Sequence, residues 1–196
     1  MNRTLEHILP RVQKPARYTG GEYNAVVKDR RAVDVRYALC FPDTYEIGMS
    51  NLGVRILYGL MNEQEGVWCE RVFAPWGDME DEMRREGLPL YGLESGDPIA
   101  DFDVIGFSLG YEMAYTNVLN MLDLAGLPLR SGERTELSPI VVAGGTCAFN
   151  PEPLAPFVDL FVLGEGEDVS VEIIQLYRQA REEGWGKEEF LTAAAR

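Results

Sequence analysis

The residue types best suited to catalysis are scarce in this chain of 196 residues. It contains one histidine, His7, and three cysteines, Cys40, Cys69 and Cys147, which are 29 and 78 residues apart. Zinc sites and iron–sulfur clusters need closely spaced ligands, so neither is expected within this chain alone. A Ser-His-Asp or Cys-His mechanism would have to use His7, which falls in a predicted N-terminal arm. The cysteines are therefore expected to be reduced and buried.

Carboxylates are the second group that could do chemistry, as general acids and bases or as magnesium ligands. They occur as the pairs Asp43 and Glu46, Asp101 and Asp103, and Glu165 and Glu167. Glu165, Glu167 and Asp168 could bind magnesium together, but the helix dipole also favours acidic residues at the start of a helix. We assign no metal site, because a solvated helix start explains these three acidic residues more simply. We assign no catalytic residue, because none of the carboxylate pairs forms a specific motif.

Four segments rich in glycine, hydroxyl and amide groups are the third candidate. They are Pro42–Gly53, Leu109–Asn117, Gly144–Pro153 and Gly164–Asp168. Glycine lets a ligand approach the backbone closely, although a glycine pair after a strand can equally form only a tight turn. The motifs GxGxxG and GxxxxGK[ST] are absent, so a dinucleotide site or a P-loop is weakly supported.

Each of these segments follows an apolar run that is typical of a buried strand. The predicted strands are Val35–Phe41, Glu70–Ala74, Val104–Ser108, Ile140–Ala143 and Leu160–Leu163. Helical patterns follow near Leu52, Asp78, Ala114 and Val169, and Lys187–Arg196 predicts one more helix. This alternation predicts an α/β fold: an open, doubly wound, Rossmann-like or flavodoxin-like parallel sheet of about five strands. Ligands bind beyond the carboxyl ends of such strands, so the four segments predict one cleft.

Charge is unevenly distributed along the chain. The net charge is −14, yet residues 1–39 hold eight basic and four acidic residues, which leaves −18 for residues 40–196. An acidic body argues against nucleic-acid binding, because an acidic surface repels phosphate. The basic segment either packs on this acidic body or forms a contact surface for another domain or an anionic ligand. No apolar run is long enough for a membrane span and no signal peptide is recognisable, so we expect a cytoplasmic protein.

Several blocks together resemble one family. RYTGGEYN, FPDTYEIGMSNLG, ERVFAPWGDME, DFDVIGFSLGYEMAYTNVLNMLDLAGLPL, AGGTCAFNPEP and LGEGED lie between Arg17 and about Glu183. This span is similar to the N-terminal domain of a family of radical S-adenosylmethionine (SAM) proteins that carry a cobalamin-binding domain. The resemblance implies a basic arm over residues 1–34, a cobalamin-binding-like domain over residues 35–185, and a linker that starts at residues 186–196.

The resemblance also implies where the cofactors would lie. The CxxxCxxC motif is absent, so an iron–sulfur cluster and SAM are expected only in a downstream radical SAM barrel of the same polypeptide. The DxHxxG motif is absent as well, so any cobalamin would be bound base-off with no histidine ligand from the first strand loop. The missing histidine equally permits a domain that kept the fold and lost the cofactor.

Four groups of cofactor-binding residues follow from the resemblance. The group beside the corrin ring is Asn51, Leu52 and Gly53. The group under the corrin and its nucleotide tail is Ser108, Leu109 and Gly110. The glycine pair that admits the tail is Gly144 and Gly145, with Thr146. The turn that faces the barrel is Gly164, Glu165, Gly166 and Glu167.

The expected function is therefore that of a corrinoid-binding domain, not catalytic by itself, that orients cobalamin over a catalytic barrel. One alternative is a cofactor-free cap domain that recruits a partner or substrate through the acidic face and basic arm. Another is a flavodoxin-like binder of flavin or nucleotide, although the loop after the first strand lacks a phosphate-binding pattern. The sequence does not identify the substrate, the reaction or the oligomeric state.

Overall fold

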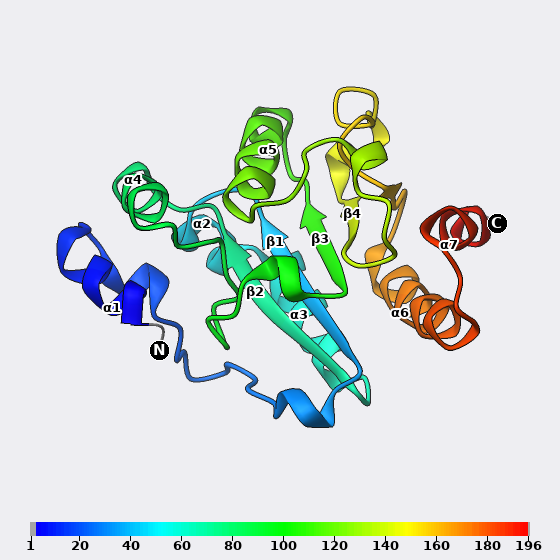
Figure 1. The fold of residues 1–196 in the computed structure, drawn as a ribbon, viewed down its shortest axis with the longest axis horizontal. Coiled ribbons are helices and arrows are strands. Elements are labelled where there is room, and N and C mark those ends of the chain that lie inside the picture. Colours follow the sequence, from blue (N-terminus) through cyan, green and yellow to red (C-terminus); the bar gives the residue numbers. More distant parts are fainter. Residues whose placement is uncertain (1–2, 196) are drawn as a thin grey trace.

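The computed structural model describes residues 3–195. Five strands form one parallel sheet in the order β2-β1-β3-β4-β5 (Figure 1). They are β1 (Val35–Phe41), β2 (Val67–Phe73), β3 (Val104–Ser108), β4 (Ile140–Gly144) and β5 (Leu160–Phe161). The predicted α/β fold with an open parallel sheet is confirmed. The strand order reverses between β1 and β3, which is where ligands bind in such sheets.

Helices cover both faces of the sheet. They are α1 (Arg3–Ile8), α2 (Tyr45–Ser50), α3 (Leu52–Glu63), α4 (Gly77–Glu86), α5 (Tyr115–Leu124), α6 (Gly166–Glu183) and α7 (Lys187–Ala194). Side chains of α1, α4 and α5 form one hydrophobic core with the sheet, and side chains of α3, α6 and α7 form the other. Helices α1 and α7 lie at opposite ends of the molecule (Figure 1).

Alternation along the strands separates these two cores. In β1, Ala38 and Cys40 face the core under α4 and α5, whereas Tyr37 and Leu39 face the core under α3 and α6. Successive side chains of a strand point to opposite faces, so a strand covered on both faces is apolar along its whole length. This explains why the apolar runs located β1 and β3 at their observed bounds.

The other predicted elements differ from the structure at their ends. Strand β2 begins at Val67 and ends at Phe73, whereas the prediction was Glu70–Ala74. Strand β5 is limited to Leu160–Phe161, because it pairs with β4 only through these two residues, and β4 extends to Gly144. The expected loop after β1 contains the short helix α2. The link from β4 to β5 contains the short 3-10 helix Thr146–Phe149.

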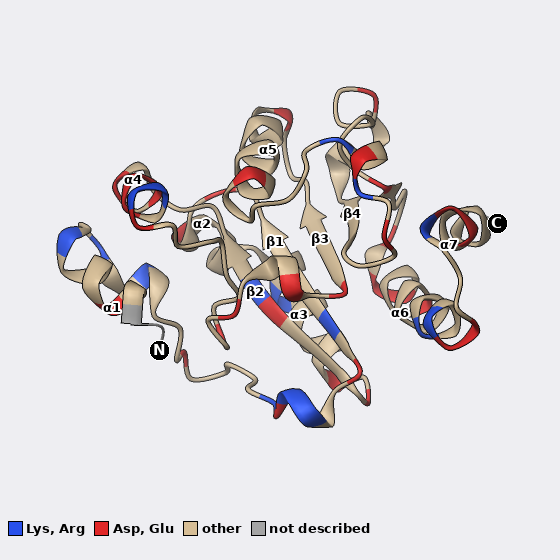
Figure 2. Cartoon of the chain, viewed as in Figure 1, with Lys and Arg blue, Asp and Glu red and all other residues tan. Residues whose placement is uncertain are grey.

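Buried ion pairs explain the error in β2. Arg36 and Glu70 form an ion pair between neighbouring strands, and both are buried. Arg71 binds Glu94 at 2.6 Å and Glu22 at 2.7 Å. Figure 2 shows the adjacent acidic and basic segments within β2. A charged side chain inside a strand is tolerated when its charge is paired, so Glu70 lies in the middle of the strand rather than at its start.

The described part of the N-terminal arm, residues 3–34, packs on the acidic body. Leu5, Ile8 and Val12 are buried in the core that also contains residues of α4 and α5. Arg11 binds Glu82 at 3.0 Å, and Arg17 binds Glu46 at 2.9 Å. The prediction that the basic segment packs on the acidic body is therefore confirmed for Arg11 and Arg17.

The C-terminal helix α7 is also attached to the domain. Phe190 is fully buried, and Lys187 Nζ donates to Asp159 and to the carbonyls of Ser131 and Arg134. The expected division of the chain at residues 34 and 185 stays a prediction. Within residues 3–195, no helix combines the length and apolar character needed to cross a bilayer.

Candidate functional site

A cavity of about 390 Å³ lies at the carboxyl end of the sheet. We call it the rim cavity. Its apolar wall comes from the sheet and from helices α3 and α6, and includes Leu39, Leu57, Val142, Val162 and Ile173. The size falls within the range of small-molecule sites, which is roughly 300–1,000 Å³. Its lining is completed by the segments after β4 and β5, by Ser108 at the end of β3 and by Gly53 in the first turn of α3.

The structure brings nine of the thirteen predicted site residues together around the rim cavity. They are Gly53, Ser108, Gly144, Gly145, Thr146, Gly164, Glu165, Gly166 and Glu167. Three of the four predicted segments contribute residues to this cavity, whereas Leu109–Asn117, the segment after β3, contributes none. Whether these residues contact a cofactor stays a prediction.

The other four predicted residues lie outside the rim cavity and shape its surroundings. The Asn51 side chain caps α3 by accepting a hydrogen bond from Val54 N at 3.0 Å. Leu52 is 67% exposed and lines a separate groove with Tyr23. Leu109 is buried and donates its N–H to the Gly144 carbonyl. The Gly110 carbonyl accepts a hydrogen bond from Thr146 Oγ1 at 3.2 Å.

The two glycines of the β4 loop have different roles. Gly145 has φ +101°, and a Cβ there would lie 2.7 Å from the Leu109 carbonyl oxygen. Gly145 is therefore required by the close approach of two backbone segments, whatever the cavity binds. A Cβ at Gly144 would make only an ordinary contact of 3.5 Å with Val162, which lines the cavity. The absence of a side chain at Gly144 thus keeps part of the rim cavity open.

Sequence analysis missed the polar group on the floor of the cavity. Tyr37 lies on β1, is only 7% exposed, and lines the rim cavity together with Gly106 of β3. A Cβ at Gly106 would overlap the Tyr37 hydroxyl, so the ring rests directly on this glycine. The signal in the sequence is a tyrosine and a glycine inside two strands that are otherwise almost wholly apolar.

Comparison with known proteins adds the family. Residues 53–196 match the family described as radical SAM proteins, N-terminal. The chain belongs to this family. This radical SAM N-terminal domain is also 28% identical over 140 residues to an uncharacterized protein, MJ0966, of Methanocaldococcus jannaschii. No solved structure matches the chain.

The extent of these matches limits what they establish. The aligned part covers 70% of this chain but only 26% of MJ0966, so the chain spans about a quarter of that relative's length. Membership in the radical SAM family implies a downstream catalytic domain, and the family uses SAM and an iron–sulfur cluster. The resemblance to radical SAM proteins is thus confirmed, while cobalamin binding stays a prediction.

The rim cavity of this radical SAM N-terminal domain carries no positive charge. Among the described residues, neither Lys nor Arg lines it, whereas Glu165 and Glu167 do. Helix α6 begins at Gly166, so both acids lie beside the helix N-terminus that favours negative charge. An anionic group such as phosphate is disfavoured next to them, and the apolar wall favours an uncharged group.

Within residues 3–195, no group of three or more His, Cys, Asp or Glu side chains could hold a metal ion. Glu165, Glu167 and Asp168 therefore do not form a magnesium site in the described structure. The three cysteines are free and buried, as expected.

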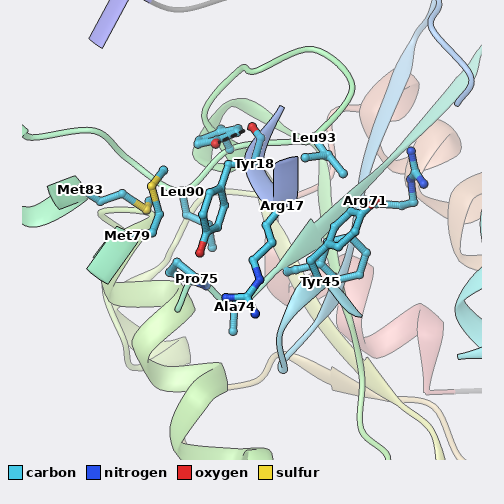
Figure 3. A pocket seen from close by; sticks show the side chains of 12 residues that line it. Arg17, Tyr18, Tyr45, Arg71, Ala74, Pro75, Met79, Met83, Leu90 and Leu93 are labelled. Atoms are coloured by element: carbon cyan, nitrogen blue, oxygen red, sulfur yellow. Dashed lines mark hydrogen bonds between the residues drawn. The ribbon is translucent and has the colours of Figure 1, made fainter. Parts of the chain in front are cut away.

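A second cavity lies under the N-terminal arm. Figure 3 shows Arg17 and Tyr18 of the arm beside Ala74, Pro75 and Leu90. Its volume is about 30 Å³, enough for about two water molecules. The Tyr18 hydroxyl accepts a hydrogen bond from Trp76 N at 3.2 Å, which ties the arm to the loop after β2. This small space therefore belongs to the packing of the arm.

Proposed function

We propose that this domain binds a corrinoid in its base-off form and presents it to the downstream radical SAM domain. The observation that carries the proposal is the rim cavity, which lies at the switch point of the sheet and has an apolar wall with no cationic side chain among its described lining residues. Its glycine-rich loops leave space at the mouth for a large planar cofactor.

Within the nucleotide tail of a corrinoid, the residues of the cavity fit the aromatic base better than the phosphate. An aromatic base is planar and uncharged, and it suits a cavity with the apolar wall of Leu39, Val142 and Ile173. Ser108 and the unpaired Tyr37 hydroxyl offer hydrogen bonds inside the cavity. Glu165 and Glu167 would keep the phosphate away from the α6 side of the mouth.

The side chains available in this chain set limits on the cobalt. The one histidine, His7, lies in α1 and does not line the rim cavity. A corrinoid bound here would have no imidazole ligand from the described residues, and when bound it would supply methyl-transfer or electron chemistry. The domain's own residues would hold the tail, orient the ring and exclude water from one face.

Exposed apolar side chains support a partner at the same edge of the sheet. Large hydrophobic residues are exposed in the segments that follow all five strands: Ile47, Leu52, Trp76, Met113, Phe149 and Leu163. Such a concentration is typical of a surface that another group covers. A corrin ring and the downstream radical SAM domain would cover it together. The same residues also support the alternative of a cofactor-free cap.

The test is an anaerobic titration of the full-length protein with methylcobalamin and cob(II)alamin, followed by gel filtration and a visible spectrum. A co-eluting base-off spectrum is expected. Gly144→Leu should weaken binding at least about tenfold, because its side chain would fill part of the cavity. The matched control is Gly132→Leu, at an exposed position where a Cβ meets nothing within 4 Å.

The outcomes distinguish the candidate functions. If the folded full-length protein retains no corrinoid, the cofactor-free cap function replaces the proposal. If Gly144→Leu and Gly132→Leu both bind the corrinoid as tightly as the wild-type protein does, the corrinoid lies outside the rim cavity. A retained yellow chromophore would support the flavin alternative, which the absence of cationic side chains in the described cavity lining disfavours.

A further inference from the structure

The rim cavity is lined by a tyrosine hydroxyl that has no protein partner in the described part of the chain. Tyr37 is 7% exposed, and no hydrogen bond joins its hydroxyl to any other residue within the described range 3–195. Among the described residues, the side-chain atoms that are fully buried without a partner are Arg36 Nε and Arg134 Nε, so the Tyr37 hydroxyl is reached by water from the rim cavity. A ligand that displaces this water loses affinity unless it offers the hydroxyl a hydrogen-bond partner of its own.

Other buried tyrosines of the same core are paired. The Tyr58 hydroxyl accepts a hydrogen bond from Val26 N at 2.6 Å. The Tyr177 hydroxyl donates to Asp103 at 2.7 Å. Tyr37 differs from both in that it lines the rim cavity, whereas they do not. Of these three tyrosines, the one whose hydroxyl has no protein partner is thus the one that lines the cavity.

The neighbouring strand holds Tyr37 in this position. Its side chain lies on the same face of the sheet as Leu39, the residue that pairs with Gly106 in the register of β1 and β3. Because Gly106 has no side chain, the tyrosine ring can rest on the backbone of β3. The hydroxyl is thereby placed beside the apolar residues that line the cavity, such as Leu39 and Val142.

The protonation state of Tyr37 is also defined. Burial raises the pKa of Tyr37 above its ordinary value, and the nearby Cys69 and Cys40 act in the same direction. The hydroxyl is therefore neutral at physiological pH and can donate its proton. No carboxylate or other acceptor among the described residues takes that proton, so an acceptor on a ligand would be favoured.

We propose that the Tyr37 hydroxyl donates a hydrogen bond to a ring nitrogen of the ligand's aromatic base and so selects ligands that carry such a base. This inference rests on the proposed corrinoid function. In a base-off corrinoid, the ring nitrogen released from cobalt is a free acceptor. The preferred class is thus an uncharged nitrogen heterocycle joined to the corrin ring, and a corrinoid without this tail loses the contact.

The experiment compares two probes in the full-length protein: cobalamin, which carries the nucleotide tail, and cobinamide, which lacks it. Tyr37→Phe should weaken cobalamin binding about 3- to 10-fold, the value of one neutral hydrogen bond. Cobinamide binding should not change. The thermal stability of the unliganded variant should stay the same or rise, because the substitution removes an unpaired hydroxyl.

Tyr58→Phe is the matched control. It should lower thermal stability, because Val26 N loses its acceptor, and leave the affinity for cobalamin unchanged. If Tyr37→Phe binds cobalamin as tightly as wild type, or weakens both probes equally, the assignment of Tyr37 is wrong while the corrinoid function stands. If wild type binds neither probe, the corrinoid function fails and this inference fails with it.

Discussion

Replacing Gly106 with alanine tests how closely β1 and β3 are fitted together. A methyl group at position 106 would overlap the Tyr37 hydroxyl and lie 2.5 and 2.8 Å from two carbons of its ring. Both residues are buried, so the ring must shift or the strands must move apart. Overpacking of this kind costs about 1–3 kcal/mol, and we expect Gly106→Ala to reduce the free energy of unfolding by that amount.

The same substitution should behave differently once the tyrosine ring is removed. The three atoms nearest to the added methyl group all belong to Tyr37. In a Tyr37→Leu background the penalty should disappear, and alanine should then be better than glycine in a strand by roughly 0.5–1 kcal/mol. The expected coupling energy between positions 37 and 106 is therefore about 1.5–4 kcal/mol.

Urea unfolding of the four proteins, followed by tryptophan fluorescence and circular dichroism, measures this cycle. The cycle includes wild type, both single variants and the double variant. An equal loss of stability from Gly106→Ala in both backgrounds would refute the reasoning, because the cost would then come from the backbone of β3 and not from Tyr37.

Three further predictions concern stability and reactivity. The side chain of Asp159 is fully buried and accepts hydrogen bonds from Arg134 and Lys187 at 2.8 Å, so Asp159→Ala should cost about 3–5 kcal/mol in urea unfolding, against less than about 0.5 kcal/mol for Asp101→Ala at an exposed position. A hydrogen bond from Arg17 lowers the pKa of Glu46 to about 2, below its ordinary 4.5. The stability difference between wild type and Glu46→Gln should therefore be full above about pH 4.5 and vanish as the pH falls through about 2, as thermal unfolding at each pH would show. A thiol reagent should label no cysteine in the native protein and all three after unfolding, and rapid native labelling would contradict the burial of Cys40, Cys69 and Cys147.

Apolar runs located β1 and β3 well, although β1 carries the buried Arg36. Both strands have their predicted bounds, because β3 is almost wholly apolar and a single charged residue does not interrupt the apolar pattern of β1. β2 was misplaced because Glu70 and Arg71 suggested the start of a strand. Their partners, Arg36, Glu94 and Glu22, are distant in the sequence, so no local pattern could show that these charges are paired inside the fold.

The candidate site was also predictable only in part. Glycines and polar residues after four strands could be placed at one edge, because the carboxyl ends of parallel strands meet there. The direction of a particular side chain could not be placed in this way. Leu109 immediately follows Ser108, yet it is buried in the core under α5 and does not line the rim cavity. Tyr37 lies further inside a strand, and the position of its ring depends on Gly106 in the neighbouring strand β3.

The exposed apolar residues at the carboxyl edge also bear on how the longer protein is made. An N-terminal domain leaves the ribosome first, and domains generally fold as units, so this edge would be exposed to water until the downstream domain is complete. During that interval two nascent chains could associate through it. The net charge of −14 opposes such an encounter, because like-charged molecules repel one another. The acidic composition would then protect the newly synthesised domain from aggregation while its partner is still being translated.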